Sequence, residues 1–217
     1  MVIQVSAKHL HGLGATMLLL ASAGLAWYGQ PTPAQKWHFM SGELEPRLIE
    51  RQVQIEPAEL AELMHNNHVD LQLIDVRNEH DWNLFHLWGA QRIPPEHLFE
   101  HRLRFAELPE NGVIVLMSND EARATEAWKL VMATASQPNA YVLAGGINRW
   151  LAEFAPGHHG RAVAAKGTVD ETLRFPLKSA LGSRHPAALP DPHHVKDLSF
   201  VSQVKLQKRV VIKGGCG

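Results

Sequence analysis

Apolar residues along the middle of the chain follow two alternating patterns, one typical of buried strands and one of helices. Short apolar runs without polar alternation, of which Val113–Met117 is the most continuous, predict strands buried on both faces. Stretches with apolar residues three and four positions apart predict helices. The strands are expected at residues 71–76, 89–94, 113–117 and 140–144, and the helices at residues 56–70, 78–85, 96–108, 120–135 and 147–154.

The alternation of strands and helices predicts the fold class. Repeats of a short strand and a helix build a parallel sheet with helices on both faces. We therefore predict an α/β domain with a central parallel sheet over residues 52–155. Ligands of such sheets bind beyond the carboxyl ends of the strands. The polar stretch Ser118–Arg123, directly after the most continuous strand, is thus the expected site.

Residues 1–30 contain an apolar stretch, residues 13–28, that is slightly shorter than the ~20 residues with which a helix spans a bilayer. Two interpretations stay open. A cleaved signal peptide would leave a soluble secreted or periplasmic protein. An uncleaved signal anchor would place Trp27 and Tyr28 at the membrane interface. We favour the anchor, so a membrane is an expected partner through residues 13–28. The folded domain is then expected on the exported side, which is the periplasm in a bacterium.

The segments on either side of the domain are expected to lack regular structure. Residues 31–51 contain Pro31, Pro33, Gly42 and Pro46, which predict an irregular linker. Residues 156–217 are rich in glycine, proline and histidine, and no apolar period persists there beyond a turn or two. We predict an extended C-terminal tail with limited local structure that ends in Gly-Gly-Cys-Gly.

Charge and composition exclude several classes of function. The net charge of -1 and the pI near 6.9 give no polyanion-binding footprint, so no nucleic-acid partner is expected. A single cysteine, Cys216, excludes an intrachain disulfide. The histidines include pairs at positions 65 and 68, 158 and 159, and 193 and 194. No pair has third and fourth ligands at a recognised spacing, so we expect no metal and no other cofactor.

Four sequence blocks in order resemble the rhodanese-like family. They are the stretches LIDVRNEHDW, FHLWGAQRIP, VIVLMSNDEAR and YVLAGGINRW. The second block is similar to the family's Gly-His-Ile-x-Gly-Ala-x-x-Ile-Pro pattern, with Phe85 at its first position, and the last keeps Gly145, Gly146 and Trp150. The resemblance covers about residues 53–155. It implies a rhodanese-like three-layer domain around the central parallel sheet.

The resemblance also assigns roles to the loop after the most continuous strand. In the family this loop begins with a cysteine, followed by four residues and usually an arginine. Aligning Arg123 with that arginine places Ser118 at the cysteine position, and aligning Met117 there loses the arginine. The family transfers sulfur through a thiolate that becomes a persulfide, which a serine cannot form. We also expect Asp120 and Glu121 to repel anionic sulfur donors.

The remaining site residues are expected to be structural. Ser118 is expected to be a polar loop residue or helix cap, and no residue of the loop is expected to be catalytic. Arg123 either binds an anion or pairs with a carboxylate. Asp75 and Arg77 are expected to form a polar pair near the site. His86, from the second block, is expected to act through a hydrogen bond.

Two functions from different classes follow. The first is a membrane-tethered binding or regulatory module with an unidentified protein partner and no sulfurtransferase activity at the loop. The second is a sulfur relay in which Cys216 is the carrier, because Lys213 and other nearby cations would favour its thiolate. An incidental exposed thiol is the alternative interpretation of Cys216.

Overall fold

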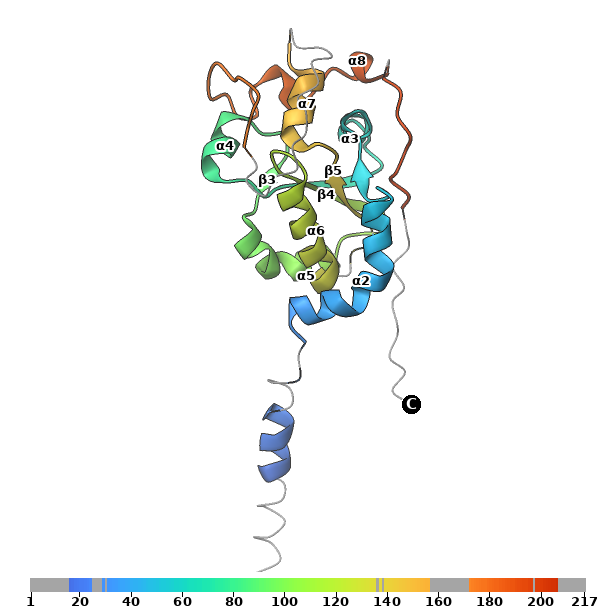
Figure 1. The fold of residues 1–217 in the computed structure, drawn as a ribbon, viewed down its shortest axis with the longest axis vertical. Helices are drawn as coiled ribbons and strands as arrows, with labels where there is room; N and C mark the ends of the chain where they lie inside the picture. The colour runs from blue at the N-terminus through green and yellow to red at the C-terminus, as the bar shows by residue number, and fades with distance from the viewer. Residues whose placement is uncertain are drawn as a thin grey trace, which may run out of the picture.

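The central element is a parallel five-stranded sheet with the strand order β1-β5-β4-β2-β3 (Figure 1). A computed structural model describes residues 16–24, 29, 31–135, 137, 139–156, 172–196 and 198–206. The predicted α/β fold with a central parallel sheet is confirmed. The strands are β1 (Gln54–Ile55), β2 (Asp70–Asp75), β3 (Gln91–Arg92), β4 (Gly112–Met117) and β5 (Ala140–Leu143).

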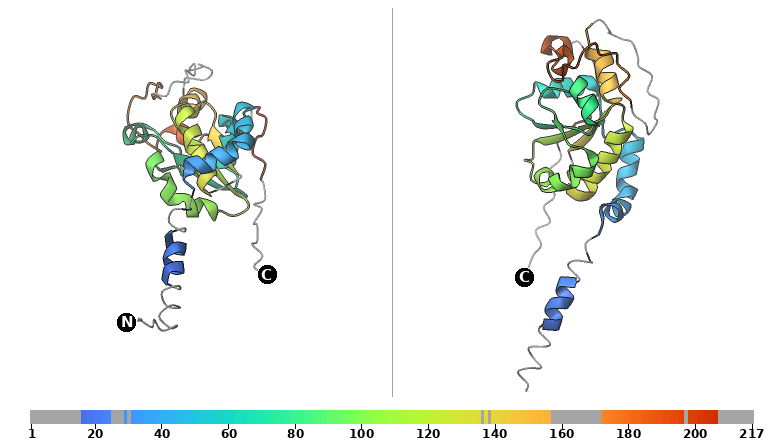
Figure 2. Two further views of the ribbon diagram at one scale, coloured as in Figure 1. Left: turned by 60° about the horizontal axis from the view of Figure 1, so that its bottom comes forward. Right: turned by 90° about the vertical axis from the view of Figure 1, so that its left-hand side faces the viewer.

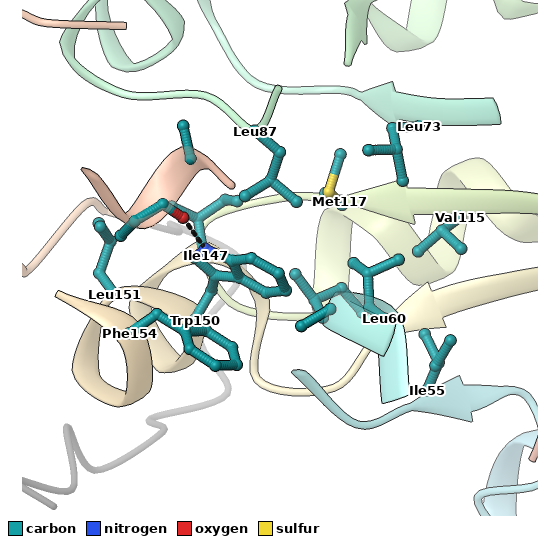
Figure 3. Close-up of a cluster of buried hydrophobic side chains, with 14 of the residues drawn as sticks. Ile55, Leu60, Leu73, Leu87, Val115, Met117, Ile147, Trp150, Leu151 and Phe154 are labelled. Atoms are coloured by element: carbon teal, nitrogen blue, oxygen red, sulfur yellow. Dashed lines mark hydrogen bonds between the residues drawn. The ribbon is translucent and has the colours of Figure 1, made fainter. Parts of the chain in front are cut away.

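Helices cover both faces of this sheet. Side chains of β4 alternate between two core clusters: Val115 and Met117 pack with α3, α7 and C-terminal residues, and Leu116 packs with α2, α5 and α6. Figure 3 shows the first cluster, in which Leu60 of α3 and Trp150 of α7 lie close to the strands. The helices are α2 (Pro33–Ile49), α3 (Pro57–Met64), α4 (Glu79–Leu84), α5 (Arg102–Ala106), α6 (Ala122–Ala135), α7 (Gly146–Phe154) and α8 (Pro192–Lys196), with 3-10 turns η1 (Pro95–His101) and η2 (Pro186–Ala188).

The predicted linker is wrong for most of its length, because residues 33–49 form helix α2. Thr32 begins the helix with a capping box: its hydroxyl accepts from the Gln35 amide, and the Gln35 side chain accepts from the Thr32 amide. Pro33 occupies the first turn, where its missing N–H removes no helical hydrogen bond. Pro46 is in the last turn. The first-turn proline is compatible with helix formation, whereas Pro46 lies inside the helix, where it removes one backbone donor without ending the helix.

Helix α2 is held on the domain by packing. Its inward side chains Trp37, Met40, Leu44 and Leu48 recur at helical spacing and join the cluster that includes α6. Trp37 meets Trp128 of α6 edge to face, with ring centroids 6.1 Å apart. Figure 2 shows α2 alongside α6 on one side of the sheet. The segment before the family-like region is therefore part of the folded unit.

The predicted membrane segment, residues 13–28, falls mostly outside the described residues. Within it, residues 16–24 are helical, and the apolar side chains of residues 17–20 are exposed. In the parts of the chain that the structure describes, no helix has both the length and the apolar character needed to cross a bilayer. The signal anchor stays a prediction.

The C-terminal segment, residues 172–206, packs onto the domain, which the sequence does not predict. It has little regular structure beyond η2 and α8. Phe175, Ala187 and Val195 nevertheless belong to the core cluster of α3 and α7, and the Trp150 indole N–H donates to the Ala187 carbonyl at 2.7 Å. Helix α8 packs against α3 (Figure 1). An extended chain can bury itself in this way because its backbone groups find partners on the domain.

A buried carboxylate of α3 fixes the far end of this segment. Glu59 is almost fully buried, and its side chain accepts hydrogen bonds from the Ser202 hydroxyl and the amides of Gln203 and Val204, all at 2.9 Å. The Tyr141 hydroxyl accepts from the Lys205 amide, and burial raises the pKa of Tyr141. The carboxylate replaces the backbone partners that an extended segment would find in a sheet.

One histidine of the segment should contribute to acid sensitivity. His185 Nδ1 accepts from the Ala187 amide at 3.1 Å, and desolvation lowers the pKa of His185 from its ordinary 6.5. Because the unfolded chain binds the proton first as pH falls, stability is lost below about pH 6.5. We expect His185→Asn, which keeps a cap acceptor, to lose less stability between about pH 7 and about pH 5.5. Urea unfolding at the two pH values measures this, and an unchanged acid loss in the variant would contradict it.

Candidate functional site

The loop after β4 lies at the carboxyl edge of the sheet, against the start of α7. The Ile147 amide donates to the Ser118 carbonyl, and the Asn148 amide donates to the Asn119 carbonyl, both at 2.9 Å. Gly146 makes this approach possible. Its φ is +60°, and an added Cβ would overlap the Asp120 carbonyl oxygen. The glycine pair after β5 therefore sets the position of the loop.

Ser118 is fully buried, and its hydroxyl accepts a hydrogen bond from the Ala124 amide at 3.1 Å. Ala124 lies in the first turn of α6, where amides have no partner within the helix. The hydroxyl thus serves as a helix cap. A serine nucleophile needs a neighbouring general base and access to substrate. The burial of Ser118 fits the capping role better than a catalytic one.

A buried ion pair supports the loop from below. Arg77 and Asp75 have side-chain exposures of 1% and 0%, and Arg77 Nη2 lies 2.6 Å from Asp75 Oδ2. Arg77 Nη1 donates to Asn119 Oδ1 at 3.2 Å, and Nη2 also donates to the Phe85 carbonyl. The side-chain nitrogen Nδ2 of Asn119 in turn donates to Asp81 Oδ2 at 2.6 Å. The pair predicted from the sequence is therefore part of a network that holds the loop.

The two loop carboxylates are each paired with an arginine from another part of the chain. Arg174 of the C-terminal segment binds both oxygens of Asp120. Arg51 lies 3.1 Å from Glu121, which also accepts from the Gly145 amide at 2.8 Å. These cations reduce the repulsion of anions expected from the sequence. The C-terminal segment also contacts the loop directly, through Arg174 and Asp120.

Arg123 lies at the edge of a pocket of about 860 Å³ beside the start of α6. Its lining combines the apolar Leu130 and Pro95 with the loop carboxylates and Arg123. Residues 120–123 of the loop thus line the pocket, and Ser118 does not. Both predictions for Arg123, an anion or a carboxylate partner, stay predictions.

His86 and His65 each have a backbone carbonyl as a hydrogen-bond partner. His86 Nδ1 lies 2.9 Å from the Trp82 carbonyl, and its ring stacks on Trp82 at 3.7 Å. His65 Nε2 lies 2.8 Å from the Pro190 carbonyl. Within the described ranges, no group of three or more metal-ligating side chains comes together. Cys216 and the histidine pair at 158 and 159 lie outside the described residues.

Three residues that organise the site have no clear signal in the sequence. Asn148 lies within the closing block YVLAGGINRW, but its contacts with Asp120 and the C-terminal segment are not visible from that position. Arg174 and Glu59 act across long separations in sequence, to Asp120 and to residues 202–204. Only the folded chain brings these partners together.

A comparison with known protein families finds a match. The family described as "Rhodanese-like domain" matches residues 56–153. Residues 56–153 are a rhodanese-like domain. Among curated relatives, the "Probable adenylyltransferase/sulfurtransferase MoeZ" from two strains of Mycobacterium tuberculosis is 34% identical over 102 residues. That match covers 47% of this chain and 25% of the relatives, so the chain spans about a quarter of their length.

Solved structures that resemble the chain include other rhodanese-like domains. The rhodanese-like domain of the Anabaena protein Alr3790 is 20% identical, covers 57% of this chain and 94% of that one, and has a TM-score of 0.41. The single-domain sulfurtransferase RDL2 of Saccharomyces cerevisiae is 19% identical, covers 46% and 88%, and has a TM-score of 0.38. The assignment of the rhodanese-like domain rests on the family match.

Proposed function

We propose that this rhodanese-like domain does not transfer sulfur at its loop and acts as a binding or regulatory module. The observation that carries the proposal is Ser118. It stands where the resemblance places the catalytic cysteine, and its hydroxyl caps α6 in a fully buried position. Sulfur transfer needs a thiolate that attacks a sulfur atom and holds it as a persulfide. A buried alcohol provides neither step.

The surroundings of the loop support the same proposal. In an active loop of this kind, inward-pointing amides would stabilise a thiolate and its persulfide. Here the side chains of Arg174 and Asn148 bind Asp120 of the loop. A sulfur donor approaching Asp120 would have to displace the C-terminal segment. A binding module needs no sulfur donor at Asp120, so the contact with the C-terminal segment does not interfere with its function.

Membrane tethering is a separate part of the proposal. We infer that residues 13–28 anchor the chain and leave the domain on the exported side, because this stretch is uncharged and ends in Trp27 and Tyr28. Mass spectrometry of the mature protein from membrane and soluble fractions tests it. An intact N-terminus in the membrane fraction supports the anchor, and a cleaved chain in the soluble fraction contradicts it.

Exposure to thiosulfate tests the inactive loop directly. We expect Cys216→Ser to gain no sulfur in intact-mass measurements and to show no thiosulfate:cyanide turnover, because no thiol remains. We also expect Ser118→Cys/Cys216→Ser to stay at the rate measured without protein. The new thiol would be fully buried, as Ser118 is.

The same assay separates the alternative functions. A gain of one sulfur atom in the wild type that is lost in Cys216→Ser would favour the sulfur relay through Cys216. An active single-domain sulfurtransferase is assayed in parallel. If Ser118→Cys/Cys216→Ser turned over thiosulfate at a comparable rate, the proposal that the loop cannot support sulfur transfer would be refuted. The active enzyme also shows that the assay works, so a negative result can be attributed to the variant.

A further inference from the structure

A short piece of the C-terminal segment, residues 172–177, lies against the loop as a bound peptide would. Its central side chain is Arg174, whose Nη1 donates to Asp120 Oδ2 at 2.7 Å while Nη2 donates to Oδ1. The Asp120 side chain is only 5% exposed. A two-pronged bond between guanidinium and carboxylate is strong and directional, and an ammonium group cannot reproduce it. The Asp120 carboxylate is therefore a binding position for an arginine side chain, which we name the guanidinium seat.

Asn148 recognises the backbone of the same piece. Its Oδ1 accepts from the Arg174 amide at 2.7 Å, and its Nδ2 donates to the Thr172 carbonyl at 2.9 Å and to Asp120 Oδ1 at 3.1 Å. One buried side chain thus holds the amide and carbonyl on either side of residue 173. Such contacts select an extended peptide backbone and leave specificity to the side chains.

The residue after the arginine adds an apolar anchor. Phe175 is buried in the core cluster that includes Trp150 and Phe154 of α7. Burying an aromatic side chain of this kind contributes much of the binding energy in recognition sites. The loop and α7 together accommodate a guanidinium, an extended backbone and a following aromatic ring.

We propose that this loop is a receptor for an arginine side chain on an extended peptide, and that residues 172–177 fill it in cis. The proposal rests on the proposed function, because it names the kind of partner that the module would bind. That partner is a protein segment in which an arginine precedes an aromatic residue. It binds by displacing the internal segment, so binding is autoinhibited.

The internal arginine leaves room for a better ligand. Among the described residues, Arg174 Nε is buried without a hydrogen-bond partner. A buried N–H that has lost water and gained no acceptor destabilises the contact. A partner arginine whose Nε meets an acceptor would compete with the internal one. The missing hydrogen bond makes it easier for a partner segment to displace residues 172–177.

The guanidinium seat is tested with the full-length chain and the methylguanidinium ion. Arg174→Ala leaves the Asp120 carboxylate facing a space of guanidinium size. We expect millimolar methylguanidinium to raise the Tm of Arg174→Ala in a saturable way, and methylammonium to bind at least about tenfold more weakly, because it lacks the planar fork. Should Arg174→Ala be unfolded alone, recovery of its folded circular dichroism signal is the same readout.

Two variants control this experiment. Arg184→Ala removes another arginine of the C-terminal segment, whose side chain donates to the nearby Leu181 carbonyl, and it should not respond. Asp120→Asn/Arg174→Ala removes the charge of the seat and should not respond. The absence of a saturable effect in Arg174→Ala, or an equal effect in Asp120→Asn/Arg174→Ala, overturns the proposal.

Binding in trans is tested with a peptide of residues 171–178. Leu173→Gly/Arg174→Ser/Phe175→Gly vacates the seat in the full chain, and fluorescence anisotropy measures binding of the labelled peptide. We expect this variant to bind the peptide at least about tenfold more tightly than a peptide with alanine for arginine, and more tightly than the wild type does. Equal affinity for both peptides overturns the proposal. Thiosulfate turnover by the same proteins would instead overturn the proposed function.

Discussion

Gly146→Ala is expected to destabilise the domain by at least about 3 kcal/mol. Gly146 has φ +60°, which a side chain disfavours, and its added Cβ would overlap the Asp120 carbonyl oxygen and lie 2.5 Å from the Ser118 carbonyl oxygen. The backbone here has little freedom to move, because the Ile147 and Asn148 amides already hold the carbonyls of Ser118 and Asn119. The overlap can be removed only if the loop moves away from α7. Urea unfolding measures the loss, and hydrogen exchange of residues 118–122 reports the loop itself.

Gly89→Ala is the matched control for this substitution. Gly89 has a similar φ of +75°, but nothing lies within 4 Å of an added Cβ. It should cost only the penalty of the left-handed conformation, about 1 kcal/mol. A comparable loss in the two variants would mean that the contact between the loop and α7 is not what makes Gly146 necessary.

Arg77→Ala is expected to cost about 3–5 kcal/mol, because it leaves the Asp75 carboxylate buried without its cation. Arg77 also donates to Asn119 Oδ1 and to the Phe85 carbonyl, so the substitution removes support from the loop and from the end of α4. The free energy of unfolding from urea titration checks the size of the effect. The methylguanidinium response of Arg77→Ala/Arg174→Ala checks the effect on the loop, and we expect weaker binding there.

An exposed ion pair provides the comparison. Glu126 and Lys129 lie 2.7 Å apart on α6, with side-chain exposures of 70% and 29%. Glu126→Ala should change stability by less than about 1 kcal/mol, since water already screens this pair. If Arg77→Ala were as mild as Glu126→Ala, the network beneath the loop would have no structural importance, and the role assigned to Asn119 would be wrong.

The sheet could be predicted from sequence because its strands carry their own signal. Val113–Met117 is apolar at every position, as a strand between two helical layers must be, and both of its faces are buried. The strand–helix alternation follows from the same pattern. Strand β1 is only two residues long, Gln54–Ile55, and such a length gives no period to recognise.

Helix α2 was hidden by its prolines. Pro33 and Pro46 suggest interruption when they are taken as residue types, yet Pro33 lies in the first turn, where no N–H donor is needed, and Pro46 removes one donor near the end of the helix without ending it. The period of Trp37, Met40 and Leu44 was present in the sequence and indicates a packed face. Position within an element, more than residue identity, decides what a proline does.

Some residues of the candidate site could be placed from the sequence, and others could not. Ser118, Asp75 and Arg77 could be placed from local blocks, since each lies at or just after a strand end. Arg174 and Glu59 could not, because the contacts of both depend on the path of the C-terminal segment, which has almost no apolar period: Arg174 lies on it, and the partners of Glu59 do. Extended segments follow the surface on which they lie, and the information for their path is distributed over the whole domain.

The burial of Val195 in the core has a consequence for biosynthesis. Val195 is 42 residues after residue 153, the last residue of the family match. At about 5–20 residues per second, the ribosome needs about 2–8 seconds to make that stretch. During this interval the apolar surface that later receives Phe175 and Val195 is uncovered on the nascent chain. Chaperones that recognise apolar surface therefore have a defined period in which to act on this protein.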